Sequence, residues 1–234
     1  MQRGYCPRRV RRCSLAGLIY LLVKLRAGLV EPSVIVDLKS IPRLRGIEHG
    51  TNGWRIGAAT SCAEIGEHDG LAAAWPGIVE ALQLIGSMQI QGRASVGGNL
   101  CNASPAADSI PALIAAGAVC EVAGVNGQRE VPVEQIVTGP GKNALGRGEF
   151  VLGLRLPDPL PRAGDAYLRL IPRTEMDIAV VGAGVALALD ANGICTHARV
   201  ALGAVAPTPI LVVDAAKALI GSKVDDAALA LVAS

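Results

Sequence analysis

The hydrophobic and polar positions along this chain follow two periods, one typical of helices and one typical of strands. Apolar residues recur at helical spacing in several segments, and short β-branched runs bounded by Gly, Asn or Pro are typical of strands. Helices are predicted over residues 15–29, 60–68, 72–85, 110–117, 212–219 and 225–233. Strands are predicted over residues 34–38, 54–58, 119–125, 129–133, 150–156, 165–172, 178–189 and 195–203. The pattern indicates an α+β protein.

Local signals fix several of the junctions between these elements. Ser61 stands three residues before Glu64, which is the spacing of a helix capping box. Asn126-Gly127 separates two strand-like runs and predicts a hairpin. The Pro-rich segment 157–161 predicts a linker. Because three predicted strands and then two helices follow it, we expect a small antiparallel C-terminal domain.

Composition excludes several classes of function. The 234 residues are 51% hydrophobic, which suits a sizeable core and not a disordered chain. The net charge of +2 is too small to indicate nucleic-acid binding, and with 3% aromatic residues stacking platforms for bases are scarce. Residues 139–142 lack the spacing of a P-loop, and residues 181–186 match only part of a dinucleotide-binding fingerprint, so neither segment predicts a nucleotide site.

The start of the chain and its cysteines bear on location. Basic residues precede the apolar run 15–23, which superficially resembles a signal peptide. The run is short, Lys24 and Arg26 follow it at once and no A-x-A site appears, so we expect neither secretion nor a membrane span. The six cysteines include no C-x₂-C pair, so they do not indicate zinc or iron–sulfur ligation. Such thiols are typical of the reducing cytoplasm, where we expect the protein.

The stretch from Ser95 to Asp108 carries the most chemical information. The adjacent residues Gly97 and Gly98 allow a positive φ and let a ligand approach bare backbone N–H groups. Successive exposed N–H groups form a concave site for phosphates. Asp108 offers a carboxylate that accepts hydrogen bonds from a ribose or ribityl hydroxyl. These residues favour a loop for a diphosphate cofactor, and the alternative is an ordinary strand–turn–helix connection.

The same stretch resembles the second FAD-binding loop of the flavin (medium) subunit of molybdenum hydroxylases, the family of carbon monoxide dehydrogenase-type and xanthine dehydrogenase-type enzymes. The resemblance extends roughly from residue 21 to residue 220. It includes residues 34–38 with 41–42, 54–58 with Thr60, 167–173 with 177–179, and 198–204 with 207–208. It implies an FAD-binding domain of the molybdenum-hydroxylase flavoprotein type, followed by a small C-terminal domain of antiparallel sheet and helices.

The resemblance also implies roles for individual residues in binding FAD. It assigns the pyrophosphate to the segment Ser95, Val96, Gly97, Gly98 and Asn99. It places Ser104 near the flavin, Asp108 on the ribityl chain and Val151 against the flavin ring. Arg169 matches a family position usually held by Lys, and the alternative for it is an exposed arginine on a strand. It implies no side chain that acts as a general acid or base, and no metal ligand in this chain.

The chain departs from the family pattern near its start. Where the family has Ala-Gly-Gly-Thr-Asp-Leu-Leu, residues 16–22 read Ala-Gly-Leu-Ile-Tyr-Leu-Leu. Bulky residues there conflict with a positive φ and with the space of a phosphate. We therefore expect a basic tail over residues 1–20, an FAD-binding domain lacking its usual first segment over 21–157, and a C-terminal domain that ends early over 165–234.

The family resemblance implies an electron-transfer function for the chain. Electrons would pass from [2Fe–2S] clusters in a small subunit to FAD in this chain, and on to NAD or a quinone-type acceptor. A large subunit would hold the molybdopterin, in a dimer of heterotrimers, and it would determine the substrate. The alternative is a flavin-free remnant, or an assembly subunit without redox activity of its own.

Overall fold

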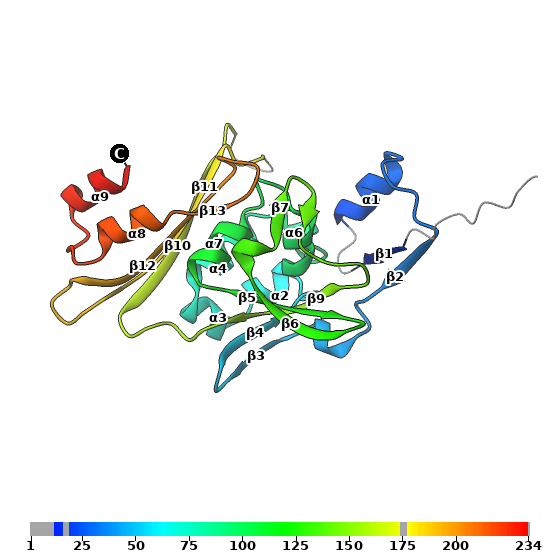
Figure 1. The fold of residues 1–234 in the computed structure, drawn as a ribbon, viewed down its shortest axis with the longest axis horizontal. Helices are drawn as coiled ribbons and strands as arrows, with labels where there is room; N and C mark the ends of the chain where they lie inside the picture. Colours follow the sequence, from blue (N-terminus) through cyan, green and yellow to red (C-terminus); the bar gives the residue numbers. More distant parts are fainter. Residues whose placement is uncertain (1–11, 16–18, 174–176, 234) are drawn as a thin grey trace, which may run out of the picture.

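Two antiparallel sheets with helices between them make up most of the molecule (Figure 1). The computed structural model describes residues 12–15, 19–173 and 177–233. One sheet has five strands and belongs to the N-terminal part of the chain, and the other has four strands and belongs to the C-terminal part. The prediction of an α+β fold with a small antiparallel C-terminal domain is confirmed.

The first described elements of the chain form a β–α–β unit. Strand β1 (Arg12–Leu15) pairs in parallel with β2 (Val34–Asp37), and helix α1 (Ile19–Arg26) connects them. The expectation of a helix starting at residue 15 is therefore wrong, because Leu15 belongs to β1 and α1 begins at Ile19. The local sequence of β1 has no strand pattern, and its pairing with the β-branched strand β2 decides its conformation. Leu18, which replaces a small residue of the family pattern, lies outside the described residues.

The five-stranded sheet has the order β3-β4-β9-β5-β6, and every neighbouring pair in it is antiparallel. Its strands are β3 (Ile47–Gly50), β4 (Gly53–Gly57), β5 (Val119–Gly124), β6 (Gly127–Pro132) and β9 (Phe150–Leu156). The hairpin predicted at Asn126-Gly127 is confirmed, and Gly127 has a φ of 109°. A short hairpin of β7 (Val137–Gly139) and β8 (Lys142–Asn143) lies between β6 and β9 in the chain, and residues 139–142, which lack P-loop spacing, form its turn.

The helices of the first domain are short. They are α2 (Cys62–Gly66), α3 (Asp69–Ala74), α4 (Pro76–Gln83), α5 (Met88–Gln91), α6 (Val96–Asn102) and α7 (Ser109–Ala115), with 3₁₀ turns at Pro42–Leu44 and Val133–Gln135. The capping box of Ser61 and Glu64 is confirmed at the start of α2. The single helix predicted over 72–85 is wrong, because Pro76 has no N–H to continue α3 and instead begins α4.

The four-stranded sheet is a meander of β10 (Ala163–Leu170), β11 (Val181–Leu189), β12 (Cys195–Gly203) and β13 (Ile210–Leu211). Helices α8 (Val213–Leu219) and α9 (Asp226–Ala233) follow it, and α8 packs on β12. The opposite face packs on α4 and α7 (Figure 1). Gly184 allows this approach, because a Cβ there would overlap the backbone of Pro111 in α7. The glycines of 181–186 thus serve packing within an antiparallel strand.

One continuous hydrophobic core joins the two domains. It includes residues of β4, β5 and β9 and the inward-facing residues of α4, α6 and α7. It also includes Tyr167, Ala186 and Ala201 of the C-terminal sheet. Every residue of α7 is buried. The second domain therefore packs directly behind the segment that begins at Asp108. Among the residues that the structure describes, no helix is both long and apolar enough to cross a bilayer.

Candidate functional site

The adjacent glycines of the predicted phosphate loop lie in the first turn of helix α6. Ser95 is the N-cap residue, and its Oγ accepts a hydrogen bond from the N–H of Gly98 at 3.2 Å. The N–H of Gly97 donates to the carbonyl oxygen of Ala58 at 2.9 Å. The expectation of a positive φ and of bare N–H groups at these glycines is therefore wrong, because the serine cap extends the helix through them.

Gly97 has a packing reason to be glycine. A Cβ added there would lie 2.6 Å from the Cβ of Ala58, which is closer than real carbon atoms approach. Helix α6 thus begins directly against the end of strand β4, and Ser61 and Ser95 form an isolated bridge beside it. The close approach fixes where the first turn of α6 and its positive dipole end point.

Helix α6 ends at a left-handed residue that turns the chain towards Asp108. Ala103 has a φ of 50° and is fully buried, which suits a small side chain in a strained conformation. Its carbonyl oxygen accepts a hydrogen bond from Gly141 at 2.8 Å. Two residues later the carbonyl oxygen of Pro105 accepts from the N–H of Ala204 at 2.8 Å, so the loop is tied to the C-terminal domain.

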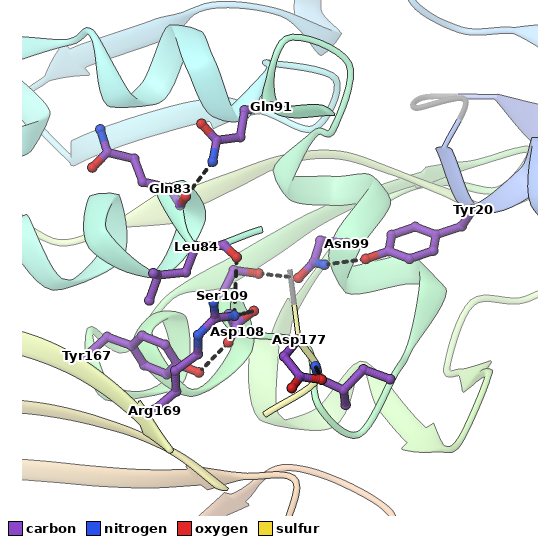
Figure 2. Close-up of polar contacts among 11 residues, drawn as sticks. Tyr20, Gln83, Leu84, Gln91, Asn99, Asp108, Ser109, Tyr167, Arg169 and Asp177 are labelled. Atoms are coloured by element: carbon purple, nitrogen blue, oxygen red, sulfur yellow. Dashed lines mark hydrogen bonds and ion pairs between the residues drawn. The ribbon is translucent and has the colours of Figure 1, made fainter. Parts of the chain in front are cut away.

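Asp108 forms the centre of a buried polar cluster that spans both domains (Figure 2). Its Oδ1 accepts a hydrogen bond from the phenol of Tyr167 at 2.8 Å. Its Oδ2 forms an ion pair with Nη1 of Arg169 at 3.0 Å, and the same nitrogen donates to the carbonyl oxygen of Leu84 at 3.2 Å. The side chains of Arg169 and Asp108 are only 8% and 11% exposed. The alternative that Arg169 is an exposed arginine on a strand is wrong.

Burial and the neighbouring polar groups have opposite effects on the pKa of Asp108. Desolvation raises the pKa of the carboxyl, whereas the hydrogen bond from Tyr167 and the charge of Arg169 lower it, and the net pKa lies above the ordinary value. Burial, together with the negative charge of Asp108, raises the pKa of Tyr167, so the phenol stays a proton donor. Asp108 is therefore a buried acceptor with a cation and a fixed donor beside it.

Asn99 marks the other end of the site. Its Oδ1 accepts from the hydroxyl of Ser109 at 2.7 Å, and its Nδ2 donates to the phenol oxygen of Tyr20 at 3.3 Å (Figure 2). Lys24, one turn further along α1, donates to Oδ1 of Asn102 at 3.2 Å. Helix α1 is thus attached to α6 by two side-chain contacts on one helix face. Burial raises the pKa of Tyr20, so this phenol also stays neutral.

Three other predicted site residues, Val96, Ser104 and Val151, make none of the contacts of this cluster. Val96 and Val151 are core residues, the first in α6 and the second in β9 opposite Val122. Ser104 is half-buried in the loop after α6. Their contacts with a flavin stay predictions. Sequence reasoning missed the cluster role of Tyr167, and the signal available was its alternation with Leu168 along a predicted strand, which puts Tyr167 and Arg169 on one face.

The described donor set fits FAD. A polyhydroxylated chain needs a buried acceptor, and Asp108 keeps lone pairs beyond the two that Tyr167 and Arg169 use. The positive dipole end of α6 suits a pyrophosphate, and Gly97 and Gly98 add no side chain there, although the N–H groups of both glycines already have acceptors. At this second end the phenol oxygen of Tyr20 accepts a hydrogen bond from the Asn99 amide. The family pattern has a short acidic residue in place of Tyr20.

The fold and this site define a class of protein, the flavin-binding subunits of molybdopterin dehydrogenases. Residues 9–159 match the family described as "FAD binding domain in molybdopterin dehydrogenase", and residues 166–234 match the "CO dehydrogenase flavoprotein C-terminal domain". The chain belongs to this family, as the sequence resemblance implied.

Named relatives agree with the family match. The chain is 35% identical over 178 residues to the putative xanthine dehydrogenase FAD-binding subunit of Escherichia coli (strain K12), which covers 75% of this chain and 61% of the relative. It is 35% identical over 216 residues to the carbon monoxide dehydrogenase medium chain of Afipia carboxidovorans, which covers 92% of this chain and 74% of that relative. The match thus spans about three fifths of the xanthine dehydrogenase subunit's length.

Solved structures of the same class have the same fold. A chain of the Cu,Mo-CO dehydrogenase in its cyanide-inactivated form matches with a TM-score of 0.90 at 33% identity, over 94% of this chain and 77% of that chain. A chain of quinoline 2-oxidoreductase from Pseudomonas putida 86 matches with a TM-score of 0.86 at 26% identity, over 95% of this chain and 76% of that chain.

Proposed function

We propose that this chain is the FAD-binding electron-transfer subunit of a molybdopterin-dependent dehydrogenase. When bound, FAD supplies the redox chemistry that passes electrons from [2Fe–2S] clusters of a small subunit to NAD or a quinone-type acceptor. The residues of this chain position the cofactor. Asp108 accepts hydrogen bonds from its hydroxyl-bearing chain, and Ser95, Val96, Gly97, Gly98 and Asn99 form the surface for its pyrophosphate. Ser104 and Val151 lie towards the flavin, and Arg169 balances the charge of Asp108.

The observation that supports this proposal most strongly is the cluster of Asp108, Tyr167 and Arg169. A buried ion pair costs desolvation energy, and apolar residues of the same volume would often stabilise a fold as well or better. Its presence where two domains meet, with a pKa of Asp108 above the ordinary value, is typical of a functional site. Family membership makes FAD the expected ligand of that site.

The proposal includes partner subunits and a location. We propose assembly with a large molybdopterin subunit and a small [2Fe–2S] subunit, as a dimer of heterotrimers in the cytoplasm. The outward face of β10 supports such contacts, because Leu168 and Leu170 are 77% and 61% exposed on the face opposite Tyr167 and Arg169. Exposed apolar side chains grouped on one surface are typical of an interface. We further propose 21–157 as the FAD-binding domain and 165–234 as the C-terminal domain.

A second candidate function is a flavin-free assembly subunit, and the contact between Tyr20 and Asn99 favours it. A phenol on the Asn99 amide competes with a phosphate for the same donor. The triple variant Leu18→Gly, Ile19→Thr, Tyr20→Asp restores the family pattern and discriminates the two candidates. If the wild-type chain lacks flavin and this variant binds it, the first segment alone is responsible for the loss.

The flavin content of the purified chain tests the proposed function. The chain is expressed alone and with candidate partner subunits, denatured, and the released flavin is identified by absorbance and chromatography. We expect close to one FAD per chain. No FAD in either preparation, even after incubation with excess FAD, would contradict the electron-transfer function and support the flavin-free alternative.

A further inference from the structure

We infer that Tyr167, in the space left by Gly182, is the positioning residue that fixes the Asp108 carboxylate for the cofactor, so that the C-terminal domain completes the FAD site. This inference rests on the proposed function and extends it. It concerns one hydrogen bond, its room within the sheet and the orientation of one acceptor. Neither residue was among the candidates that the sequence pattern provided.

Two bonds from one strand hold the two oxygens of Asp108. Tyr167 donates to Oδ1 at 2.8 Å and Arg169 pairs with Oδ2 at 3.0 Å. Because both donors point from the same face of β10, the plane of the carboxylate is fixed relative to the second domain. An acceptor held in this way loses little rotamer entropy when a hydroxyl group binds to it. The bond from Tyr167 therefore orients Asp108 before the ligand arrives.

Gly182 leaves the room that the phenol needs. It lies on β11 opposite Arg169 in the register, and a Cβ added there would overlap the phenol oxygen of Tyr167. Its φ is not in the left-handed region, so the backbone does not require glycine there. The position of the Tyr167 hydroxyl thus explains why residue 182 has no side chain. Tyr167 as a whole is only 3% exposed.

Within the part of the chain that the structure describes, the charged and titratable groups that face Asp108 are Tyr167 and Arg169 from β10 and Tyr20 from α1. The hydrogen bond from Tyr167 lowers the pKa of Asp108 against the larger effect of burial. Removing that bond raises the pKa of Asp108 further. An ionised carboxylate is the stronger acceptor. When the solution is acidified, FAD affinity therefore begins to fall at a higher pH in such a variant than in the wild type.

The test compares FAD dissociation constants of the full chain and its variants, measured by quenching of flavin fluorescence. Tyr167→Phe removes only the hydroxyl, and we expect affinity at neutral pH to fall about tenfold. Gly182→Ala keeps the tyrosine and displaces it, so we expect a loss of similar size. The matched control is Gly164→Ala, where a Cβ meets nothing within 4 Å on the same strand as Tyr167.

A double variant and a pH series separate positioning from a merely structural role. If both changes act through one contact, Gly182→Ala adds little in the Tyr167→Phe background. We expect the acid limb of the affinity profile to move to higher pH in both single variants and to stay in place in Gly164→Ala. A structural effect alone lowers the unfolding midpoint and leaves that limb where it is.

The outcomes distinguish the inference from the proposed function. If the wild-type chain binds no FAD at any pH, both fail. If it binds FAD and Tyr167→Phe binds it equally well, or more weakly without a shift of the acid limb, the inference fails and the proposed function stands. If Tyr167→Phe does not fold, Gly182→Ala and its pH profile decide the result in the same way.

Discussion

Asp108 and Asp165 are two carboxylates at the same boundary between domains, and their surroundings differ. Asp108 belongs to the first domain and meets Tyr167 and Arg169 of β10. Asp165 belongs to β10 itself and meets the first turn of α4, where a Cβ on Gly77 would lie 2.7 Å from Oδ2. One carboxylate has a cation and a phenol as partners, and the other has the backbone end of a helix.

The comparison shows how the partners of a buried carboxylate distinguish a candidate site, Asp108, from a structural cap on a helix, Asp165. Burial raises the pKa of Asp165 to about 6, although hydrogen bonding from the N–H groups of Gly77 and Ile78 lowers it. Among the described residues Oδ1 of Asp165 has no hydrogen-bond partner. At Asp108 a full charge opposes the same desolvation. A helix end stabilises a carboxylate modestly, whereas the buried guanidinium of Arg169 forms a charge-assisted bond with the carboxylate of Asp108.

The largest effect is expected for Asp108→Ala. This change leaves the Arg169 guanidinium buried without its partner, so the free energy of unfolding falls by about 3–5 kcal/mol. FAD affinity falls by about 1.5–3 kcal/mol, because a charge-assisted bond to the cofactor is lost. Denaturant unfolding and fluorescence titration measure the two losses.

The matched control for Asp108→Ala is Asp214→Ala, which removes one half of an exposed ion pair with Lys217. Its unfolding free energy should change by less than about 1 kcal/mol. Equal losses in the two variants would show that the Asp108 cluster contributes no more to stability than a surface pair.

The next effect is a pH dependence that belongs to Asp165. Its pKa in the folded state is raised to about 6, above the unfolded value, so the stabilisation that this carboxyl contributes is fully present below the ordinary carboxyl pKa and is lost as the pH rises through about 6. Asp165→Asn has no proton to lose and lacks this decline. The difference between the two unfolding free energies is measured from pH 4 to pH 8, and parallel curves would contradict the prediction.

The smallest effect is expected for Arg169→Lys. Lysine keeps the positive charge opposite Asp108, but its shorter side chain does not place a nitrogen where Nη1 of Arg169 contacts both Asp108 and the carbonyl oxygen of Leu84. We expect the unfolding free energy to fall by about 1 kcal/mol, in line with the loss of one hydrogen bond. A loss as large as that of Asp108→Ala would mean that the geometry of the pair matters more than its charge.

The elements that local signals specify could be predicted from the sequence. The capping box at Ser61 and the hairpin at Asn126-Gly127 depend on neighbouring residues alone, and both are confirmed. Helix α6 could not be predicted in the same way, because two glycines argue against a helix and the contact of Gly97 with Ala58 overrides that preference. Strand β1 likewise depends on a partner more than twenty residues away in the sequence.

The candidate site likewise contains residues that a local pattern predicts and residues that depend on distant contacts. Asp108 and Asn99 could be named from a short continuous stretch, although their contacts with FAD stay predictions. Tyr167 lies 59 residues from Asp108, and Tyr20 lies 79 residues from Asn99. Those pairs depend on how the domains pack, which no local pattern encodes.

FAD affinity in two matched variants tests the central claim most directly. Asp108→Asn and Asp165→Asn remove the same charge from the same domain boundary, and each is titrated with FAD beside the wild-type chain. We predict affinity about tenfold weaker for Asp108→Asn, because a charge-assisted bond becomes a neutral one, and unchanged affinity for Asp165→Asn. Equal affinities in all three proteins, or a loss confined to Asp165→Asn, would contradict the assignment of Asp108 to the cofactor.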